Sequence, residues 1–429
     1  MTILTTCLSR FIEKWIHPLT HSRYFLIICV TLLWLIADNA LEFVFPTKLE
    51  SIGKSYFEIG ILLALASVGG MLIDFPMGAL SDRMSRKKLM IRGFIVLIIG
   101  SIFIFSFEDN LLLGFSFFFW GLGFQIWRVP RDAYYASLSM DNTVKVAQSY
   151  GIDIEMKYIG QTVGPLIAGF LLLWFGFHSI VGFYSVILLF CALVLMKYMK
   201  ETNNRPAFES VKSLKPGIIF KRIKDFKTRF GLFGFSMLYF ALLFTAWEQI
   251  LLTFQPLFYG EDVLNVPSNM GGLLMACFSL PGIFISYHAG KFADKFGKKN
   301  ILLLGLIIMG VALISFSSVT DLALVFVFAL LVSVGWVISS PALCGLIANL
   351  SYGHKKGEIA GIWDFFMDVG FVSGPILGGI IAQFAGIRSV FFILGIVFFI
   401  SALLLIFIKL RSEKKEHAIC KQAATALSN

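Results

Sequence analysis

The sequence predicts an all-α membrane protein in which twelve transmembrane helices form two pseudo-symmetric six-helix bundles. Hydrophobic residues make up 58% of the 429 residues and charged residues 14%, against about 45–50% and about 25% in soluble proteins. Stretches apolar enough to cross about 30 Å of hydrocarbon, roughly 20 residues each, recur along the whole chain. We count twelve of them, and this number excludes a water-soluble fold.

The predicted spans fall into two sets of six. The first set is Tyr24 to Pro46, Phe57 to Ser81, Leu89 to Phe107, Leu111 to Leu138, Ala147 to Phe175 and Phe177 to Met196. The second set is Phe230 to Phe258, Met270 to Ala289, Asn300 to Ser318, Leu322 to Leu350, Glu358 to Phe384 and Val390 to Lys409.

An internal repeat divides the chain into two equivalent halves. Asp38 and Glu248 stand 210 residues apart, and each lies eight residues before a proline. At the same offset, Gly160, Gly164, Pro165 and Gly169 recur as Gly370, Gly374, Pro375 and Gly379. A fixed long period of this kind indicates a duplicated unit. We therefore expect bundles at 24–196 and 230–410, a basic cytoplasmic linker at 197–229, and cytoplasmic segments at 1–23 and 411–429.

The net charge of +10 reports orientation and does not indicate a nucleic-acid partner, because the basic residues gather in every second loop. By the positive-inside rule both termini are expected in the cytoplasm and the protein in the plasma membrane. The part of the linker around Ile218 and Ile223 fits either an amphipathic helix on the inner leaflet or a solvated basic tether.

Several kinds of chemistry are not predicted. The six cysteines form no CxxC pair, so neither a disulfide framework nor a zinc site is indicated. Gly53-Lys54-Ser55 lacks the upstream glycine of a phosphate-binding loop, because Lys48 stands in its place. We expect no metal, no cofactor and no enzymatic activity.

The ends of the second and eighth spans carry matching loop motifs. Each motif has a glycine suited to close helix approach, an acid at the membrane edge and a basic turn that holds the loop in the cytoplasm. The members are Gly78, Asp82, Arg83 and Arg86, and then Gly290, Asp294 and Lys298. The pair resembles the loop signature of the major facilitator superfamily, with Ser85 where that family prefers glycine. The resemblance implies two bundles that rock about a central site, with these loops as gates; the alternative is a plain topological anchor.

The fifth span carries small residues four apart, which let helix backbones touch. Gly160, Gly164, Pro165 and Gly169 resemble an element typical of proton-coupled exporters in the same superfamily, with Ala168 replacing one glycine. The resemblance implies efflux. Generic tight packing is the alternative.

Acids inside apolar spans are the main candidates for a functional site. Asp38 and Glu42 share one face of the first helix, and Glu248 lies in the seventh. An ionisable group in hydrocarbon costs several kcal/mol unless it faces a partner or a cavity. Burial favours the protonated carboxyl, so such acids suit proton exchange near neutral pH. The resemblance adds that the first and seventh helices line the central cavity; static pairing is the alternative.

Charged residues in the fourth, fifth and eleventh spans are further candidates. Arg128 or Arg131 is expected either to bind an anionic substrate or to respond to protonation of a nearby carboxyl. For Arg131 and Asp132 the alternative is a salt-bridge cluster between the fourth and fifth spans that shapes the inner gate. Asp364 lacks a basic neighbour on the tenth helix and is a second candidate for a proton or cation site. Exporters of this branch place an arginine where Phe117 stands here, which weakens the match to them.

The function expected from these residues is proton-coupled export of a small organic compound, with Asp38 as the favoured proton carrier. Glu42, Arg128, Glu248 and Asp364 are secondary site candidates. The partners are a small-molecule substrate, protons and the lipid bilayer, and the chain is expected to be a monomer. The alternatives are proton-coupled uptake of a metabolite or metal-chelating compound, and a sensor or scaffold that transports nothing.

Overall fold

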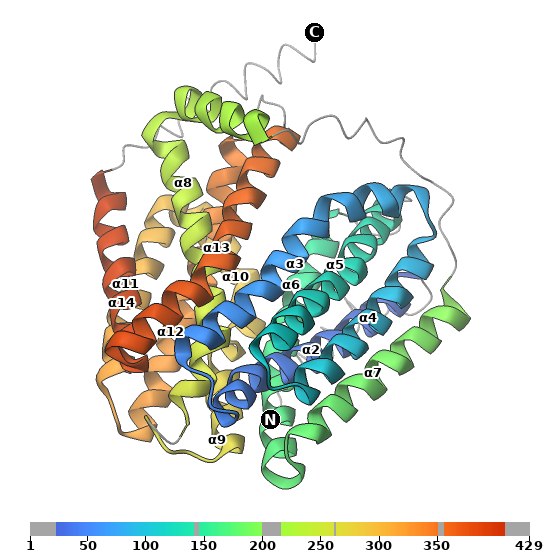
Figure 1. The fold of residues 1–429 in the computed structure, drawn as a ribbon. Coiled ribbons are helices and arrows are strands. Elements are labelled where there is room, and N and C mark those ends of the chain that lie inside the picture. The colour runs from blue at the N-terminus through green and yellow to red at the C-terminus, as the bar shows by residue number, and fades with distance from the viewer. Residues whose placement is uncertain (1–22, 141–145, 200–215, 261–262, 351–355, 408–429) are drawn as a thin grey trace, which may run out of the picture.

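The computed structural model describes residues 23–140, 146–199, 216–260, 263–350 and 356–407, whose secondary structure is entirely helical (Figure 1). Twelve segments among them are long and apolar enough to cross a membrane, which confirms the predicted spans. The first half contains α2 (Arg23–Ser51), α3 (Tyr56–Arg83), α4 (Arg86–Ser106), α5 (Asn110–Met140), α6 (Val146–Phe175) and α7 (Phe177–Tyr198). The second contains α8 (Pro216–Phe258), α9 (Ser268–Cys277), α10 (Leu280–Phe296), α11 (Lys298–Ser318), α12 (Leu322–Leu350), α13 (Lys356–Ala385) and α14 (Ile387–Phe407).

The eighth span is broken, although the sequence predicts one continuous helix from Met270 to Ala289. Helix α9 ends at Cys277, and α10 begins at Leu280 with Pro281 in its first turn. Proline has no backbone N–H and tolerates only the start of a helix, so the break falls just before it. Together α9 and α10 supply the span Ser268–Ser286.

Most of the predicted cytoplasmic segments lie outside the described residues: 1–22, 200–215 of the linker, and 408–429. The rest of the linker belongs to α8, which turns at Gly231, where φ is +59°. Glycine carries no Cβ and adopts this left-handed conformation readily. The first turns of α8 consequently run across one end of the molecule before the span Phe233–Phe258 descends (Figure 1).

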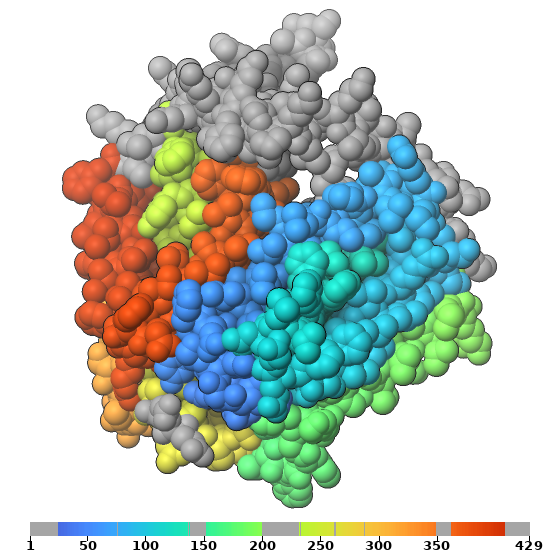
Figure 2. All heavy atoms as spheres, in the orientation of Figure 1, coloured from blue at the N-terminus to red at the C-terminus, as the bar shows by residue number. Residues whose placement is uncertain are grey.

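The two halves meet backbone to backbone at two equivalent places. A Cβ added to Gly60 of α3 would overlap the carbonyl oxygen of Pro375 of α13, and one added to Gly272 of α9 would overlap that of Pro165 of α6. Ser268 of α9 also donates to the carbonyl oxygen of Gly169 at 3.2 Å. Figure 2 shows α3, in blue, lying directly against α13, in orange. We call this surface of contact the seam.

At the other end of the molecule the halves diverge (Figure 1). An added Cβ would meet nothing within 4 Å at Gly78 or at Gly290. The expectation that these glycines permit close helix approach is therefore wrong for this conformation. Both lie at the open end, where no helix of the other half covers them.

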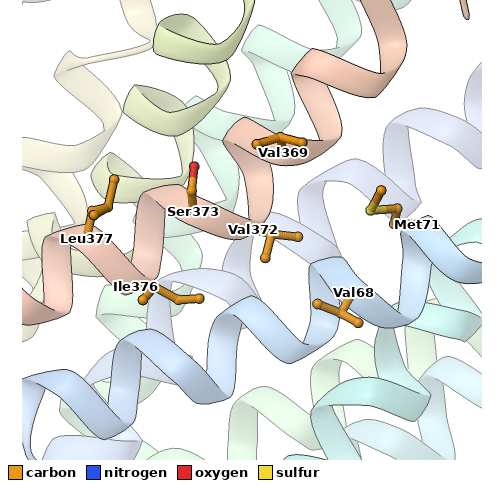
Figure 3. A pocket seen from close by; sticks show the side chains of 7 residues that line it. All are labelled: Val68, Met71, Val369, Val372, Ser373, Ile376 and Leu377. Atoms are coloured by element: carbon orange, nitrogen blue, oxygen red, sulfur yellow. The ribbon is translucent and has the colours of Figure 1, made fainter. Parts of the chain in front are cut away.

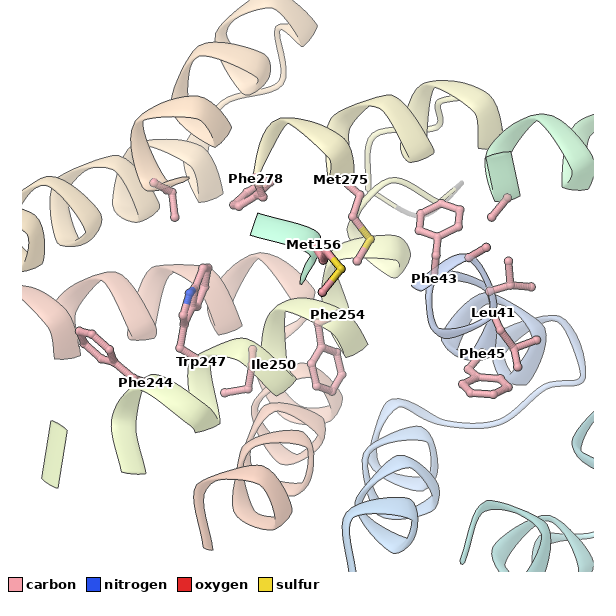
Figure 4. Close-up of a cluster of buried hydrophobic side chains, with 14 of the residues drawn as sticks. Leu41, Phe43, Phe45, Met156, Phe244, Trp247, Ile250, Phe254, Met275 and Phe278 are labelled. Carbon is pink, nitrogen blue, oxygen red and sulfur yellow. The ribbon is translucent and has the colours of Figure 1, made fainter. Parts of the chain in front are cut away.

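Aromatic and aliphatic side chains fill the space beside the seam. Figure 4 shows residues of α2, α6, α8 and α9 gathered in one cluster, with Met156 and Met275 side by side. Three tryptophans pack within this core: the Trp34 and Trp127 ring centroids lie 5.6 Å apart, and the Trp336 ring centroid lies 4.9 Å from that of Phe244. These contacts favour a packing role for the rings.

Candidate functional site

An ion pair joins the two halves at the centre of the molecule. Lys157 Nζ of α6 lies 2.5 Å from Glu248 Oε1 of α8. Gln161, one turn further along α6, donates from Nε2 to the same oxygen at 3.5 Å. Glu42 of α2 lies within electrostatic range of both Lys157 and Glu248. We call the group the central cluster; it consists of Asp38, Glu42, Lys157, Gln161, Tyr184 and Glu248.

Asp38 lies inside the first half and does not face lipid. Its residue is 2% exposed, and its Oδ1 accepts a hydrogen bond from the Tyr184 hydroxyl of α7 at 3.2 Å. Glu42 follows one helical turn later on the same face of α2 and is half-buried. Because Asp38 is enclosed by its own half, Glu42 is the member of the pair that reaches the other half.

Close helix packing positions the central cluster. An added Cβ at Gly164 would come within 2.7 Å of the carbonyl oxygen of Ile36 and 2.8 Å of the backbone nitrogen of Ala40. Gly160 packs in the same way on Leu35. Backbone contact at these two glycines brings the Lys157 face of α6 next to the acidic face of α2.

A second polar cluster lies between α3, α5 and α13. Arg128 of α5 is 3.7 Å from Asp74 of α3, and its Nε donates to Gln125 Oε1 at 2.7 Å. Asp364 and Asp368 of α13 feel the charges of both Asp74 and Arg128. Asp364 has no basic neighbour on the tenth helix; the cation within its electrostatic range, Arg128, belongs to the other half.

Arg131 forms a third, more static group. Its Nη2 lies 2.7 Å from Asp132 and 3.7 Å from Asp153, and its guanidinium stands 5.4 Å from the Trp34 ring centroid. The Arg131 side chain is only 6% exposed. This arrangement matches the alternative of a salt bridge between the fourth and fifth spans.

An apolar crevice of about 350 Å³ runs along the seam between α3 and α13 (Figure 3). It is lined by Val68, Met71, Val369, Val372, Ser373, Ile376 and Leu377. Asp74 lies three residues beyond Met71 on α3, so the second polar cluster stands near one end of the crevice.

The two gating-loop motifs make equivalent contacts. Arg86 lies 3.6 Å from Asp82 and donates to the carbonyl oxygen of Ala133 at 3.1 Å. In the second half Lys298 lies 3.8 Å from Asp294 and donates to the carbonyl oxygen of Gly345 at 3.4 Å. Arg83 lies in the last turn of α3. Each basic residue therefore ties its loop to the end of a neighbouring helix.

Three residues that carry these clusters were not singled out from the sequence as sites. Asp74 fits the criterion applied to Asp38, an acid within an apolar span, and could have been found by it. Lys157 stands in a charged stretch of the fifth span with Asp153 and Glu155, and this stretch alone indicates no partner for it. The role of Tyr184 left no signal, since its partner lies 146 residues away. Across the described residues, no group of three or more His, Cys, Asp or Glu side chains is placed to hold a metal ion.

The chain is similar in sequence to one protein family and to several known proteins. The sequence model of the family described as Major Facilitator Superfamily matches residues 26–271 and 248–426. Quinolone resistance protein NorA of Staphylococcus aureus is 33% identical over 150 residues, which are 34% of this chain and 38% of that protein. Multidrug resistance protein 2 of Bacillus subtilis is 28% identical over 146 residues, 34% of this chain and 36% of that protein. The matched stretch thus spans less than two fifths of either relative.

Solved structures share the fold. The nucleoside transporter NupG superposes with a TM-score of 0.71 at 11% identity, covering 90% of this chain and 100% of that chain. A POT family transporter in complex with 5-aminolevulinic acid superposes with a TM-score of 0.70 at 12% identity, covering 89% of this chain and 94% of that one.

Proposed function

The chain belongs to the Major Facilitator Superfamily, a family of membrane transporters and not of enzymes, and on this premise we propose that it exports a small organic compound in exchange for protons. Transport would proceed by alternating access, with residues 24–196 and 230–410 as the two moving halves joined by the linker 197–229.

The charge balance of the central cluster carries the proposal of proton exchange. Glu42 and Glu248 lie within electrostatic range of the Lys157 ammonium, and Asp38 lies within electrostatic range of Glu42. An unpaired charge in the apolar interior is costly, so two of the three carboxyl groups are expected to hold protons when the cluster is neutral. Asp38 is the favoured proton carrier, and Glu42 connects it with the contact between the halves. Arg128 and Asp364 are assigned to a second polar site.

Two observations support export. The matched relatives are named for resistance to quinolones and to multiple drugs. The glycine and proline element of α6 resembles that of proton-coupled exporters, and it packs against α2 directly beside the acids.

The orientation follows from the basic loops. The open end carries Asp82, Arg86, Asp294 and Lys298, and the positive-inside rule assigns these loops to the cytoplasm. On this assignment the structure is open inward, both termini are cytoplasmic, and the protein lies in the plasma membrane as a monomer. The gating loops would separate further or close with each cycle.

Proton-coupled uptake is the second candidate, and one residue favours it. Phe117 occupies the position where the exporters of this branch carry an arginine, and it is buried against Phe45, with ring centroids 5.1 Å apart. Because this position holds a buried phenylalanine, it does not supply the positive charge of that arginine.

Transport into inverted membrane vesicles with an imposed proton gradient tests the proposal. Candidate compounds would come from a comparison of extracellular metabolites and drug tolerance with and without the gene. Accumulation driven by an acidic vesicle interior supports exchange of protons for substrate. Efflux of preloaded compound together with protons would support uptake instead, and absence of gradient-driven flux for every compound that binds would overturn both in favour of a sensor.

A further inference from the structure

We propose that Lys157 is a positioning residue whose ammonium group passes from Glu248 to Glu42 when Glu42 loses its proton, which links proton occupancy to the contact between the halves. The link between this exchange and transport rests on the proposed function, whereas the exchange itself does not. It concerns a residue to which none of the motifs assigns a task.

The Lys157–Glu248 pair differs from the other ion pairs by joining the two halves. Its atoms lie 2.5 Å apart across the boundary between α6 and α8. The pairs formed by Arg86, Arg128, Arg131 and Lys298 each connect groups of one half. If the halves move apart at this boundary, the Lys157–Glu248 pair must break, whereas the other pairs can stay intact.

Lys157 has two further acids within electrostatic range, both in its own half. Asp153 lies one turn earlier on α6 and Glu42 lies on α2. Asp153 already has Arg131 at 3.7 Å, so Glu42 is the acid without a cation of its own. The Lys157 side chain is 49% exposed, which leaves its flexible stem room to change partner.

The remaining groups around the pair are neutral. Gln161 donates to Glu248, Tyr184 donates to Asp38, and Tyr158 packs on Gly282 of α10 near Trp336 and Glu248. The charge of the cluster is consequently set by one ammonium and by the protons on Asp38, Glu42 and Glu248.

The exchange releases one proton from the cluster. A proton leaves the Glu42 carboxyl for water, and the carboxylate formed attracts the Lys157 ammonium within the first half. Glu248 keeps its negative charge and loses its partner, so the ion pair between the halves is broken. Each exchange changes the proton content of the cluster by one, and the contact between the halves therefore depends on pH.

The second half has no ammonium at the position equivalent to Lys157. That position in the duplicated unit, 210 residues later, is Met367, and the position equivalent to Glu42 is Leu252. The exchange therefore has no counterpart at the equivalent positions of the second half.

The pH dependence of the distance between the halves tests the proposal without any substrate. Spin labels at Leu80 of α3 and Phe292 of α10, which are 37% and 50% exposed, would report the width of the open end in a cysteine-free background. Pulsed electron resonance distances would be recorded from about pH 5 to about pH 9, the range over which perturbed carboxyl groups titrate. Size-exclusion profiles would show that each variant is folded.

The proposal predicts that a variant which keeps the ion pair nevertheless loses the pH response. In E42Q the Lys157 ammonium has no second carboxylate to move to, so its pair with Glu248 persists and the distance should stay constant over the whole pH range. In K157Q and E248Q the pair is absent at every pH, so the distance should again be constant, at the value that the parent reaches at high pH. K157R keeps the charge and should stay near the parent.

A pair that only holds the halves together predicts that E42Q behaves as the parent does, because the pair is intact in both proteins, and that result would overturn the proposal. Absence of any pH-dependent distance change in the parent would also overturn it. If K157Q does not fold, E42Q and K157R still decide. Because no substrate is present, these outcomes are separate from the vesicle test of export.

Discussion

Asp38 and Glu248 occupy the same position in the two halves of the chain, yet their surroundings differ. Asp38 is 2% exposed and accepts a hydrogen bond from Tyr184 within its own half. At the position equivalent to Tyr184 the second half has Leu394, which offers no hydrogen bond. Glu248, with its side chain 16% exposed, pairs instead with Lys157 of the first half. Duplication thus supplied two similar acids, and later divergence of their neighbours left one enclosed and one facing across the boundary.

The scaffold around the acids diverged much less. Arg86 and Lys298 each reach an acid four residues earlier and a carbonyl oxygen 47 residues later. Gly164 and Gly374 each pack on the backbone of the first helix of their own half. The backbone contacts are thus equivalent in the two halves, whereas the polar side chains around the two acids differ.

Replacing Asp38 with Asn should have the largest effect. The amide cannot exchange a proton, so we expect gradient-driven transport in vesicles to be abolished while counterflow without a gradient continues. Glu108→Gln, at an exposed position, is the matched control and should keep driven transport. Driven flux at the parent level in Asp38→Asn would exclude Asp38 as the carrier and remove the functional contrast with Glu248.

Adding side-chain volume at the equivalent packing glycines should destabilise both halves. Gly164→Val and Gly374→Val place carbon atoms against the backbones of α2 and α8, and such overpacking costs about 1–3 kcal/mol. Gly78→Ala and Gly290→Ala meet open space and should leave the melting temperature unchanged in this conformation. Thermal unfolding of the detergent-solubilised protein measures these effects. Equal losses at all four glycines would show that the open end closes in solution.

Removing the Tyr184 hydroxyl should shift the pH dependence of transport. The hydroxyl donates to Asp38 and stabilises its ionised form, so in Tyr184→Phe the acid keeps its proton to higher pH. A hydrogen bond worth about 0.5–1.5 kcal/mol moves the midpoint upward by up to about one unit. Tyr239→Phe is the control in the other half, because the Tyr239 hydroxyl bonds Ser401 at 2.8 Å. A downward shift in Tyr184→Phe would contradict this reading of the hydrogen bond.

The smallest effects on stability are expected from replacing Arg86 and Lys298, the basic residues of the two gating loops. The side chains of Arg86 and Asp82 are 9% and 17% exposed, whereas those of Lys298 and Asp294 are 21% and 73% exposed. An exposed ion pair contributes only about 0–1 kcal/mol, so Lys298→Gln should change stability within that range. Arg86→Gln also removes the partner of Asp82, which is less exposed to water than Asp294, so this substitution should lower the stability more. Melting temperatures compared side by side check the order, and a greater loss in Lys298→Gln would reverse it.

The sequence predicted the twelve spans, the repeat and the acids within them, because these features depend on apolar length and on spacing alone. It could not assign partners. In a membrane the outward face of a helix is as apolar as the inward face, so hydrophobic periodicity does not show which way Asp74, Lys157 or Tyr184 points. The cation near Asp364 comes from Arg128, which is 236 residues earlier in the chain. The break between α9 and α10 had a visible signal in Pro281, which the continuous apolar pattern obscured.

The bare contacts of the seam have a mechanical consequence. Where Gly60 lies on the carbonyl of Pro375 and Gly272 on that of Pro165, main chain touches main chain. Parting at these two points requires no side chain to change its rotamer. Separating the halves at this end would therefore cost mainly the hydration of peptide groups and of the apolar side chains that line the rest of the seam.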